Sequence, residues 1–334
     1  MATADQLKAL IKSFREQDST RFYRVALQLA AHEARLGHGK LAGELRELID
    51  WARAETSSVQ GGRRPIPITK PRGELEGLLS VSYPDLHLKD MVLPSELKDI
   101  FQRILKEHLH QHRLLEHGLS PRRKFLLLGP PGTGKSMAAK VLAGELHLPL
   151  FIVRFEALIT KFMGETAAKL RLIFDAMHQT RGVYLFDEFD AIGAQRAMPN
   201  ETGEIRRVLN SFLQFIEEDN SLSIIIAATN HMEILDRALF RRFDDVIRFD
   251  VPLKELIVRL LQDKLAPYGR EELDWNELAG EAVGLSYGDL VRACEDAVKD
   301  MVLEGRKSVT RDSLRRALRS RKDSLPSRNS AERS

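Results

Sequence analysis

Two different spacings of hydrophobic residues divide the chain. In residues 1–54, apolar side chains recur every three or four positions, which is the spacing of amphipathic helices. The first such stripe consists of Leu7, Leu10, Ile11 and Phe14. The pattern predicts a small helical N-terminal domain, followed over residues 55–73 by a flexible linker whose prolines disfavour regular structure.

Between residues 74 and 252, short apolar runs alternate with helical segments. This alternation predicts an α/β subdomain in which helices cover both faces of a parallel sheet. Residues 253–320 have helical spacing throughout and predict an all-α lid subdomain. Residues 321–334 are rich in serine and arginine and predict a disordered basic tail.

A glycine-rich stretch follows the first strongly apolar run of the α/β segment, Phe125–Leu128, and precedes a helical run. It fits the pattern G-x-x-x-x-G-K-[ST] of a phosphate-binding loop, in which backbone N–H groups surround a phosphate at a helix N-terminus. Lys135 would reach the β- and γ-phosphates, and the Ser136 hydroxyl would bind Mg²⁺. The predicted nucleotide-contacting residues of this stretch are Gly129, Pro130, Pro131, Gly132, Thr133, Gly134, Lys135, Ser136 and Met137.

Two further buried-strand patterns end in polar residues. The run Val183–Phe186 ends in Asp187 and Glu188, about fifty residues after the loop. We predict that Asp187 helps to hold Mg²⁺ and that Glu188 polarises the attacking water. A third run ends in Asn230, which is placed to orient water between Glu188 and the γ-phosphate.

The adjacent arginines Arg241 and Arg242 lie in residues 235–244, which resemble the second region of homology of the AAA family. Residues 161–166 resemble the first pore loop of that family. Residues 284–290 are similar to its lid-helix motif, with Tyr287 in place of a glycine and Gly288 in place of an alanine. Gly118–Pro121 looks like the family's lead-in to the loop strand, and Asp90–Leu93 is similar to its adenine segment without the usual glycine.

The doubled arginine most resembles the katanin and spastin type, so the chain is identified as a member of the AAA family from about Leu75 to about Arg319. The resemblance implies an ATPase that uses ATP and Mg²⁺. It implies that Arg241 and Arg242 act on the nucleotide of a neighbouring subunit in a homohexamer. Asp90 and Gly288 would contact the nucleotide. The loop that would grip a polypeptide consists of Lys161, Phe162, Met163 and Gly164.

The N-terminal helices resemble the small helical domains of bacterial stand-alone AAA proteins. The resemblance implies that residues 1–54 select a protein substrate or partner. Some such proteins act beside a subtilisin-like serine protease, which is therefore a candidate partner. The sequence itself contains no H-E-x-x-H motif, so we expect any proteolysis to come from a separate protein.

Composition and residue spacing bear on membrane insertion, cellular location and metal binding. No run of about 18 apolar residues is present, so we expect no membrane span. The single Cys294 lies in a helical stretch and is expected in the core, and a reducing cytoplasm follows as the default location. His108 and His112 have the helical spacing of a metal site, but no carboxylate or cysteine set accompanies them.

Three functions remain open on the sequence. The pore-loop aromatic Phe162 favours an ATP-driven, ring-forming protein remodeller: an unfoldase, segregase or disassembly factor. The alternative is an ATP-dependent regulatory switch that binds and restrains a partner without threading it. Nucleic-acid binding depends only on the basic C-terminal tail, which is more often a solubilising end, so nucleic acid is not expected as a partner.

Overall fold

The structure is a computed structural model, and it describes residues 43, 71, 73–158, 165–189, 202–230, 240–270 and 273–324. The chain separates into two compact units, Met1–Pro65 and Ile66–Ser334. Apart from residue 43, the predicted N-terminal domain lies outside the described residues, as do most of the predicted linker and Lys161, Phe162, Met163 and Gly164.

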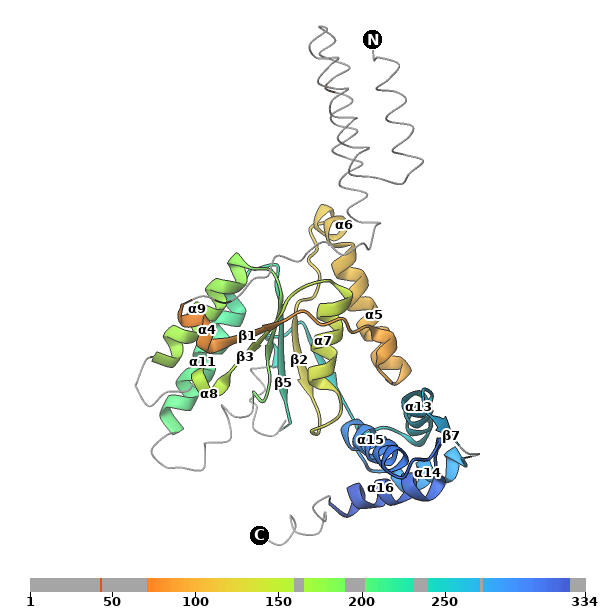
Figure 1. Cartoon of the computed structure of the whole chain (residues 1–334). Coiled ribbons are helices and arrows are strands. Elements are labelled where there is room, and N and C mark those ends of the chain that lie inside the picture. Colours follow the sequence, from red (N-terminus) through yellow and green to blue (C-terminus); the bar gives the residue numbers. More distant parts are fainter. Residues whose placement is uncertain are drawn as a thin grey trace, which may run out of the picture. The chain divides into compact units, whose positions relative to one another are not determined.

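The described elements begin with an α/β segment (Figure 1). Its elements are α4 (Glu74–Leu78), β1 (Leu79–Ser82), the 3₁₀ helix η1 (Leu88–Asp90), α5 (Ser95–Leu109), α6 (Gln111–Glu116), β2 (Lys124–Leu128), α7 (Lys135–Glu145), β3 (Leu150–Val153), α8 (Phe155–Leu158), α9 (Glu165–Gln179), β4 (Val183–Phe186), α11 (Thr202–Glu218), β5 (Ile224–Thr229) and β6 (Asp245–Arg248). The lid consists of α13 (Lys254–Leu265), β7 (Gly269–Arg270), α14 (Trp275–Ala282), α15 (Tyr287–Leu303), β8 (Ser308–Val309) and α16 (Arg311–Asp323).

The central sheet has the strand order β1-β3-β4-β5-β2-β6. Strands β3, β4, β5, β2 and β6 are parallel, and β1 pairs with β3 in the antiparallel direction at the edge. The predicted parallel sheet is therefore confirmed except for this edge strand. Strand β2, which precedes the phosphate loop, lies between β5 and β6, so both of its edges are hydrogen-bonded.

Helices cover both faces of the sheet, as predicted. In Figure 1, α9 and α11 lie on one side of the strands and α5 and α7 on the other. Successive strand residues point to opposite faces, so Leu126 and Tyr184 join one core cluster while Phe125 and Leu185 join the other. All four side chains are essentially inaccessible to solvent, which makes the middle of the sheet a rigid support for its strand ends.

The lid has its own core, built from α13, α14, α15 and α16. Cys294 is buried in it, as predicted, and burial raises the pKa of its thiol to about 12. The prediction of an all-α lid was wrong in one respect, because Gly269–Arg270 pairs in parallel with Ser308–Val309. Two-residue strands are too short to show a hydrophobic period in the sequence.

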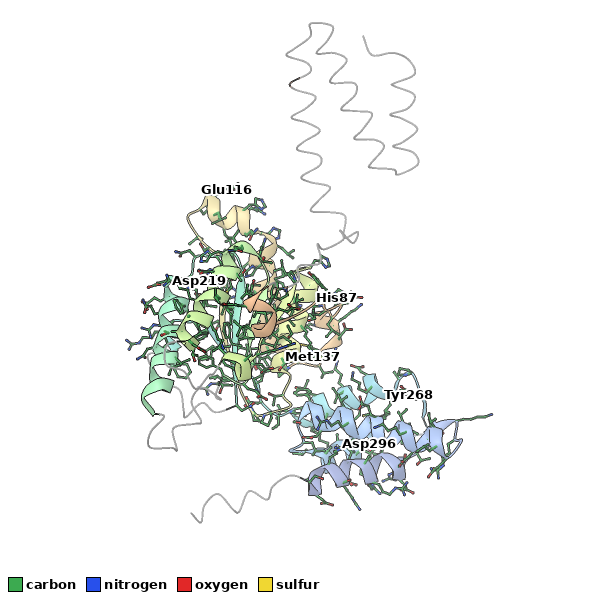
Figure 2. All side chains as sticks on the ribbon, turned by 60° about the vertical axis from the view of Figure 1, so that its left-hand side comes forward. His87, Glu116, Met137, Asp219, Tyr268 and Asp296 are labelled. Atoms are coloured by element: carbon green, nitrogen blue, oxygen red, sulfur yellow. The ribbon has the colours of Figure 1, made fainter. Side chains whose placement is uncertain are left out.

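The predicted tail also begins too early. Helix α16 continues to Asp323, so residues 321–323 are helical. Ion pairs hold this end of the helix: Arg321 pairs with Asp296, and Arg319 pairs with Glu281. Figure 2 labels Asp296, which lies on α15. Residues 325–334 lie outside the described part of the chain.

The histidine-rich segment is not one helix. Helix α5 ends at Leu109 and α6 begins at Gln111, so His108 and His112 stand on different helices. His108 is buried, and its Nε2 lies 2.6 Å from the Arg122 carbonyl oxygen. Among the described residues, no group of three or more His, Cys, Asp or Glu side chains could hold a metal ion. The described helices also include none long and apolar enough to cross a bilayer.

Candidate active site

The phosphate loop leaves β2 in a conformation that requires glycine. Gly129 has φ 145°, and a Cβ atom there would lie 1.9 Å from the Phe249 carbonyl oxygen. Gly134 has φ 105° and stands directly before α7, which begins at Lys135. Glycine adopts these dihedrals without steric cost, so the loop can curl closely in front of the N-terminus of α7.

Lys135 is buried, and its ammonium group is surrounded by oxygen atoms. Its Nζ donates to the carbonyl oxygens of Gly129 at 2.6 Å and Pro130 at 2.9 Å. It also donates to Asn230 Oδ1 at 2.8 Å. The positive charge thus stands inside the loop, beside the residue that the sequence predicted to orient water.

Ser136 and Asp187 meet at the mouth of the loop. The Ser136 hydroxyl donates to Asp187 Oδ2 at 2.5 Å, although the two residues are far apart in the sequence. A hydroxyl and a carboxylate are hard oxygen ligands of the kind that Mg²⁺ prefers beside nucleotide phosphates. These two residues therefore fit the predicted Mg²⁺ site.

Glu188 has an unusual backbone conformation. It has φ 54°, one of two positive values among the described non-glycine residues. Its neighbour Phe189 is buried and packs against Phe155 and Phe212, with ring centroids 6.3 Å and 4.6 Å away. A left-handed conformation in a residue with a side chain is costly and persists where the surroundings enforce it. Here the buried Phe189 anchors the turn that presents Glu188 to the cavity.

A cavity of about 530 Å³ joins these groups. It is lined by residues 131–137 of the loop, by Asp187, Glu188 and Asn230 at the strand ends, and by residues 90–92. Helices α13 and α15 of the lid complete it. The structure therefore brings most of the predicted nucleotide-binding and hydrolytic residues into one site. Arg241 and Arg242 do not line the cavity, and Arg242 Nε donates instead to Glu217 Oε2 at 2.9 Å.

The lid contacts the phosphate loop through the start of α15. The backbone N–H of Gly288 donates to the Gly132 carbonyl oxygen at 2.9 Å. A Cβ atom on Gly132 would lie 2.4 Å from the Ser286 hydroxyl, so only glycine fits there without a shift. Ser286 and Asp289 form a capping box that fixes this helix end. Gly288, which the sequence predicted as a nucleotide contact, lies beside the loop and lines the cavity.

Residues 90–92 form another part of the cavity wall. Met91 packs into the core under α7, whereas Val92 packs against the lid core, so this segment contacts both subdomains. Asp90 lines the cavity, but its Oδ2 accepts the His87 N–H at 2.8 Å and caps η1. The sequence predicted Asp90 only as a nucleotide contact, and the structure adds this capping role.

The C-terminal end of α7 supports residues 86–88, which precede the 90–92 wall. Glu145 Oε1 accepts the Leu88 N–H at 2.8 Å, and Glu145 Oε2 lies 3.6 Å from His87 Nδ1. A Cβ atom on Gly144 would lie 2.2 Å from the Leu86 carbonyl oxygen, so the two chain segments are in close contact. Helix α7 therefore carries the phosphate loop at its start and supports the 90–92 wall at its end.

Sequence reasoning missed the lid side chains of the cavity. Lys264 on α13 and Arg292 and Glu295 on α15 all line it. For Arg292 and Glu295, the sequence signal is that they lie four and seven positions after Gly288, on the same helical face. Lys264 had no such signal, because its position at the cavity depends on how α13 packs.

Comparison with known proteins agrees with the site. Residues 125–251 match the family of ATPases associated with various cellular activities (AAA). The chain is 35% identical over 321 residues to the uncharacterized AAA family ATPase y4kL of Sinorhizobium fredii, and the match covers 95% of each chain. It is 32% identical over 260 residues to the ATP-dependent zinc metalloprotease FtsH of Helicobacter pylori, covering 74% of this chain and 40% of that protein. It is 30% identical over 259 residues to the proteasome-activating nucleotidase of Aeropyrum pernix, covering 73% of this chain and 62% of that protein.

The phosphate loop, Asp187, Glu188 and the start of α15 line one cavity, and a relative is matched along nearly its whole length. The chain therefore belongs to the AAA family of ATPases.

Proposed function

We propose that this ATPase is a ring-forming protein remodeller, an unfoldase, segregase or disassembly factor driven by ATP hydrolysis. The observation that carries the proposal is the arrangement of charges around the cavity. The phosphate loop, Asp187 and Glu188 line it, but Arg241 and Arg242 do not. The site of one chain thus has the groups for hydrolysis, and the paired arginines remain for the nucleotide of a neighbour.

Within one chain, the roles follow from position. Glu188 is the general base that polarises the attacking water, and Asn230 orients this water while its amide oxygen holds the Lys135 ammonium. Ser136 and Asp187 hold Mg²⁺, which when bound neutralises charge on the β- and γ-phosphates. Lys135 exchanges its carbonyl partners in the loop for phosphate oxygens when ATP enters.

The arginines act between subunits in this proposal. Arg241 is exposed, and Arg242 is partly exposed beside Glu217. Arginines supplied in trans stabilise transition-state charge, and head-to-tail contacts between identical chains close into a ring. We infer a homohexamer that assembles with ATP.

Mixing two inactive variants tests this arrangement. Arg242→Ala leaves the phosphate loop and Glu188 intact, whereas Lys135→Ala leaves the arginines intact. Arg242→Ala alone should have very low ATPase activity, because losing an arginine finger costs on the order of a thousandfold in related systems. Lys135→Ala alone should be inactive because it lacks the lysine that reaches the β- and γ-phosphates. The mixture should regain a fraction of wild-type activity that rises with protein concentration. A mixture that co-assembles and stays inactive would place the arginines' role within their own chain.

Mechanical work is assigned to the predicted pore loop, with Phe162 gripping an extended polypeptide beside Lys161, Met163 and Gly164. Residues 1–54 would select the substrate or partner. Two relatives have names that link AAA modules to proteolysis, an ATP-dependent metalloprotease and a proteasome-activating nucleotidase. We therefore propose a separate protease as a partner, a subtilisin-like serine protease being one candidate.

Unfolding of a tagged substrate separates the remodeller from a regulatory switch. Phe162→Ala should keep nucleotide binding and most ATPase activity but lose substrate unfolding. If wild-type protein binds a partner through residues 1–54 and never alters its structure with ATP, the switch is the correct function. The basic helix α16 gives little support to nucleic-acid binding, because Arg311, Arg315 and Arg319 pair with Glu277 and Glu281 on α14.

A further inference from the structure

The nucleotide cavity has a polar end and an apolar side. The phosphate loop supplies the polar end, with the buried Lys135 and with Ser136 beside Asp187. Apolar and aromatic side chains that also pack in the lid core line the other side: Val92, Leu260, Tyr287 and Val291. A nucleotide whose phosphates lie in the loop directs its base to these side chains, because apolar surfaces suit the flat faces of a base.

Glu295 on α15 is the acidic side chain that the described part of the lid contributes to the cavity. It is exposed, and it forms no ion pair with a described residue. Other carboxylates of the lid each have an arginine partner: Asp263, Glu277, Glu281 and Asp296. The carboxylate of Glu295 is therefore available to a ligand in the cavity.

The position of Glu295 along α15 separates it from the phosphates. At the start of the helix, the N–H of Gly288 donates to the Gly132 carbonyl oxygen of the loop at 2.9 Å. Glu295 follows seven residues later on the same face, about 10 Å farther along the helix axis. Side chains on a helix lean toward its N-terminus, so Glu295 covers the turn that contains Val291. Its carboxylate is thus directed to the apolar side of the cavity.

The charge of Glu295 excludes phosphate as its ligand. An ionised carboxylate only accepts hydrogen bonds, and it repels phosphate oxygens. The neutral part of a nucleotide offers two kinds of donor, the ribose hydroxyls and the amino group of the base. The apolar side chain of Val291, one turn before Glu295, suits the base better than the ribose.

We propose that Glu295 accepts a hydrogen bond from the exocyclic amino group of adenine and thereby selects adenine over guanine nucleotides. Adenine carries this amino donor at the position where guanine carries the acceptor O6. In GTP, O6 would face the carboxylate, and a site built to hydrogen-bond one group rejects an analogue that leaves its acceptor unpaired. The proposal rests on the nucleotide binding of the proposed function, but not on the ring or the motor.

The experiment measures dissociation constants by calorimetry in the full chain carrying Glu188→Gln, which prevents turnover. The ligands are ATP, GTP, 2′-deoxyATP and purine riboside triphosphate, which is ATP without the amino group. Each comparison uses the ratio of two affinities, because removing a negative charge from the cavity alters the binding of every nucleotide.

Glu295→Ala should lower the affinity for ATP about tenfold relative to purine riboside triphosphate, because one hydrogen bond to a charged group is lost. The affinity for 2′-deoxyATP should fall as much as that for ATP. Glu295→Gln should bind GTP more tightly than the parent chain does, since its amide N–H can donate to O6. Glu255→Ala removes an exposed lid glutamate that does not line the cavity, and it should leave all ratios unchanged.

Thermal unfolding of each variant without nucleotide checks that the lid is folded. An unchanged ratio of ATP to purine riboside triphosphate in Glu295→Ala would overturn the proposal. A loss for ATP that 2′-deoxyATP does not share would assign Glu295 to the ribose and overturn it as well. If the parent chain binds no ATP, the proposed function fails too; if it binds ATP and GTP equally, only the role of Glu295 is wrong.

Discussion

The two ends of the central sheet carry similar residues for opposite purposes. At the amino ends of the parallel strands, Arg123 pairs with the fully buried Asp219, and Arg122 pairs with Glu107 and Asp245. At the carboxyl ends, Lys135 donates to the Gly129 carbonyl oxygen and to Asn230, Asp187 accepts the Ser136 hydroxyl, and both residues line the cavity. Figure 2 shows Asp219 and Met137, the residue that follows the phosphate loop, well apart on the α/β subdomain.

The difference explains which charges stabilise the fold and which do chemistry. A buried carboxylate whose arginine lies beside it holds the structure together, because removing either partner leaves an uncompensated charge. A carboxylate that faces a cavity beside a hydroxyl is available to a metal ion and to water. Substitutions at the two ends should therefore separate stability from activity.

The largest expected effect is at the carboxyl end. Glu188→Gln keeps the size of the side chain and removes the base, so the ATPase rate should fall about 100-fold or more. The free energy of unfolding and the affinity for ATP should stay close to those of the wild type. Steady-state ATPase assays and calorimetry measure these quantities. Near-normal turnover in Glu188→Gln would assign the base to another residue.

The amino end should behave in the opposite way. Asp219→Asn breaks the buried pair with Arg123 and should lower the free energy of unfolding by about 3 kcal/mol. The affinity for ATP, measured where the variant is folded, should not change. Denaturant titration tests this, with the exposed Asp99→Asn as the control. A selective loss of ATP binding in folded Asp219→Asn would show that the two ends are coupled.

A smaller effect on the affinity for ATP is expected from Glu145, at the end of α7. Glu145→Ala removes the acceptor of the Leu88 N–H, which supports the 90–92 wall. The affinity for ATP should fall about fivefold, as for the loss of one hydrogen bond. Glu145→Gln should recover most of the affinity, because its amide oxygen still accepts. Glu116→Ala, an exposed glutamate on α6 labelled in Figure 2, is the control and should bind as the wild type does. Equal affinities in all three variants would contradict the supporting role.

The smallest effect concerns pH and lies at the amino end. Burial lowers the pKa of His108, outweighing the hydrogen bond to the Arg122 carbonyl oxygen. The unfolded chain therefore binds the proton at a higher pH than the folded chain, and the stability that His108 contributes is lost as the pH falls below its ordinary value of 6.5. His108→Gln should show a shallower fall of the melting temperature between pH 7 and pH 5. An identical slope in both proteins would exclude this role.

Much of the active site could be predicted because it follows contiguous strand-end motifs. The phosphate loop comes directly after β2, Asp187 directly after β4 and Asn230 directly after β5. Parallel strands place their carboxyl ends at one edge, so these three positions had to meet. The Lys135–Asn230 and Ser136–Asp187 hydrogen bonds agree with that expectation.

The hydrophobic pattern by itself determined the covered sheet and the helical lid, and the glycine-rich motif determined the residues of the phosphate loop, because period and spacing are local properties of the chain. Only the tertiary structure decided the antiparallel direction of β1, the short β7–β8 pair and the break between α5 and α6. It alone decided that Glu145 supports the 90–92 wall and that Arg292 and Lys264 line the cavity. These contacts join segments far apart in the sequence, and their positions depend on how packed helices meet, which no local spacing encodes.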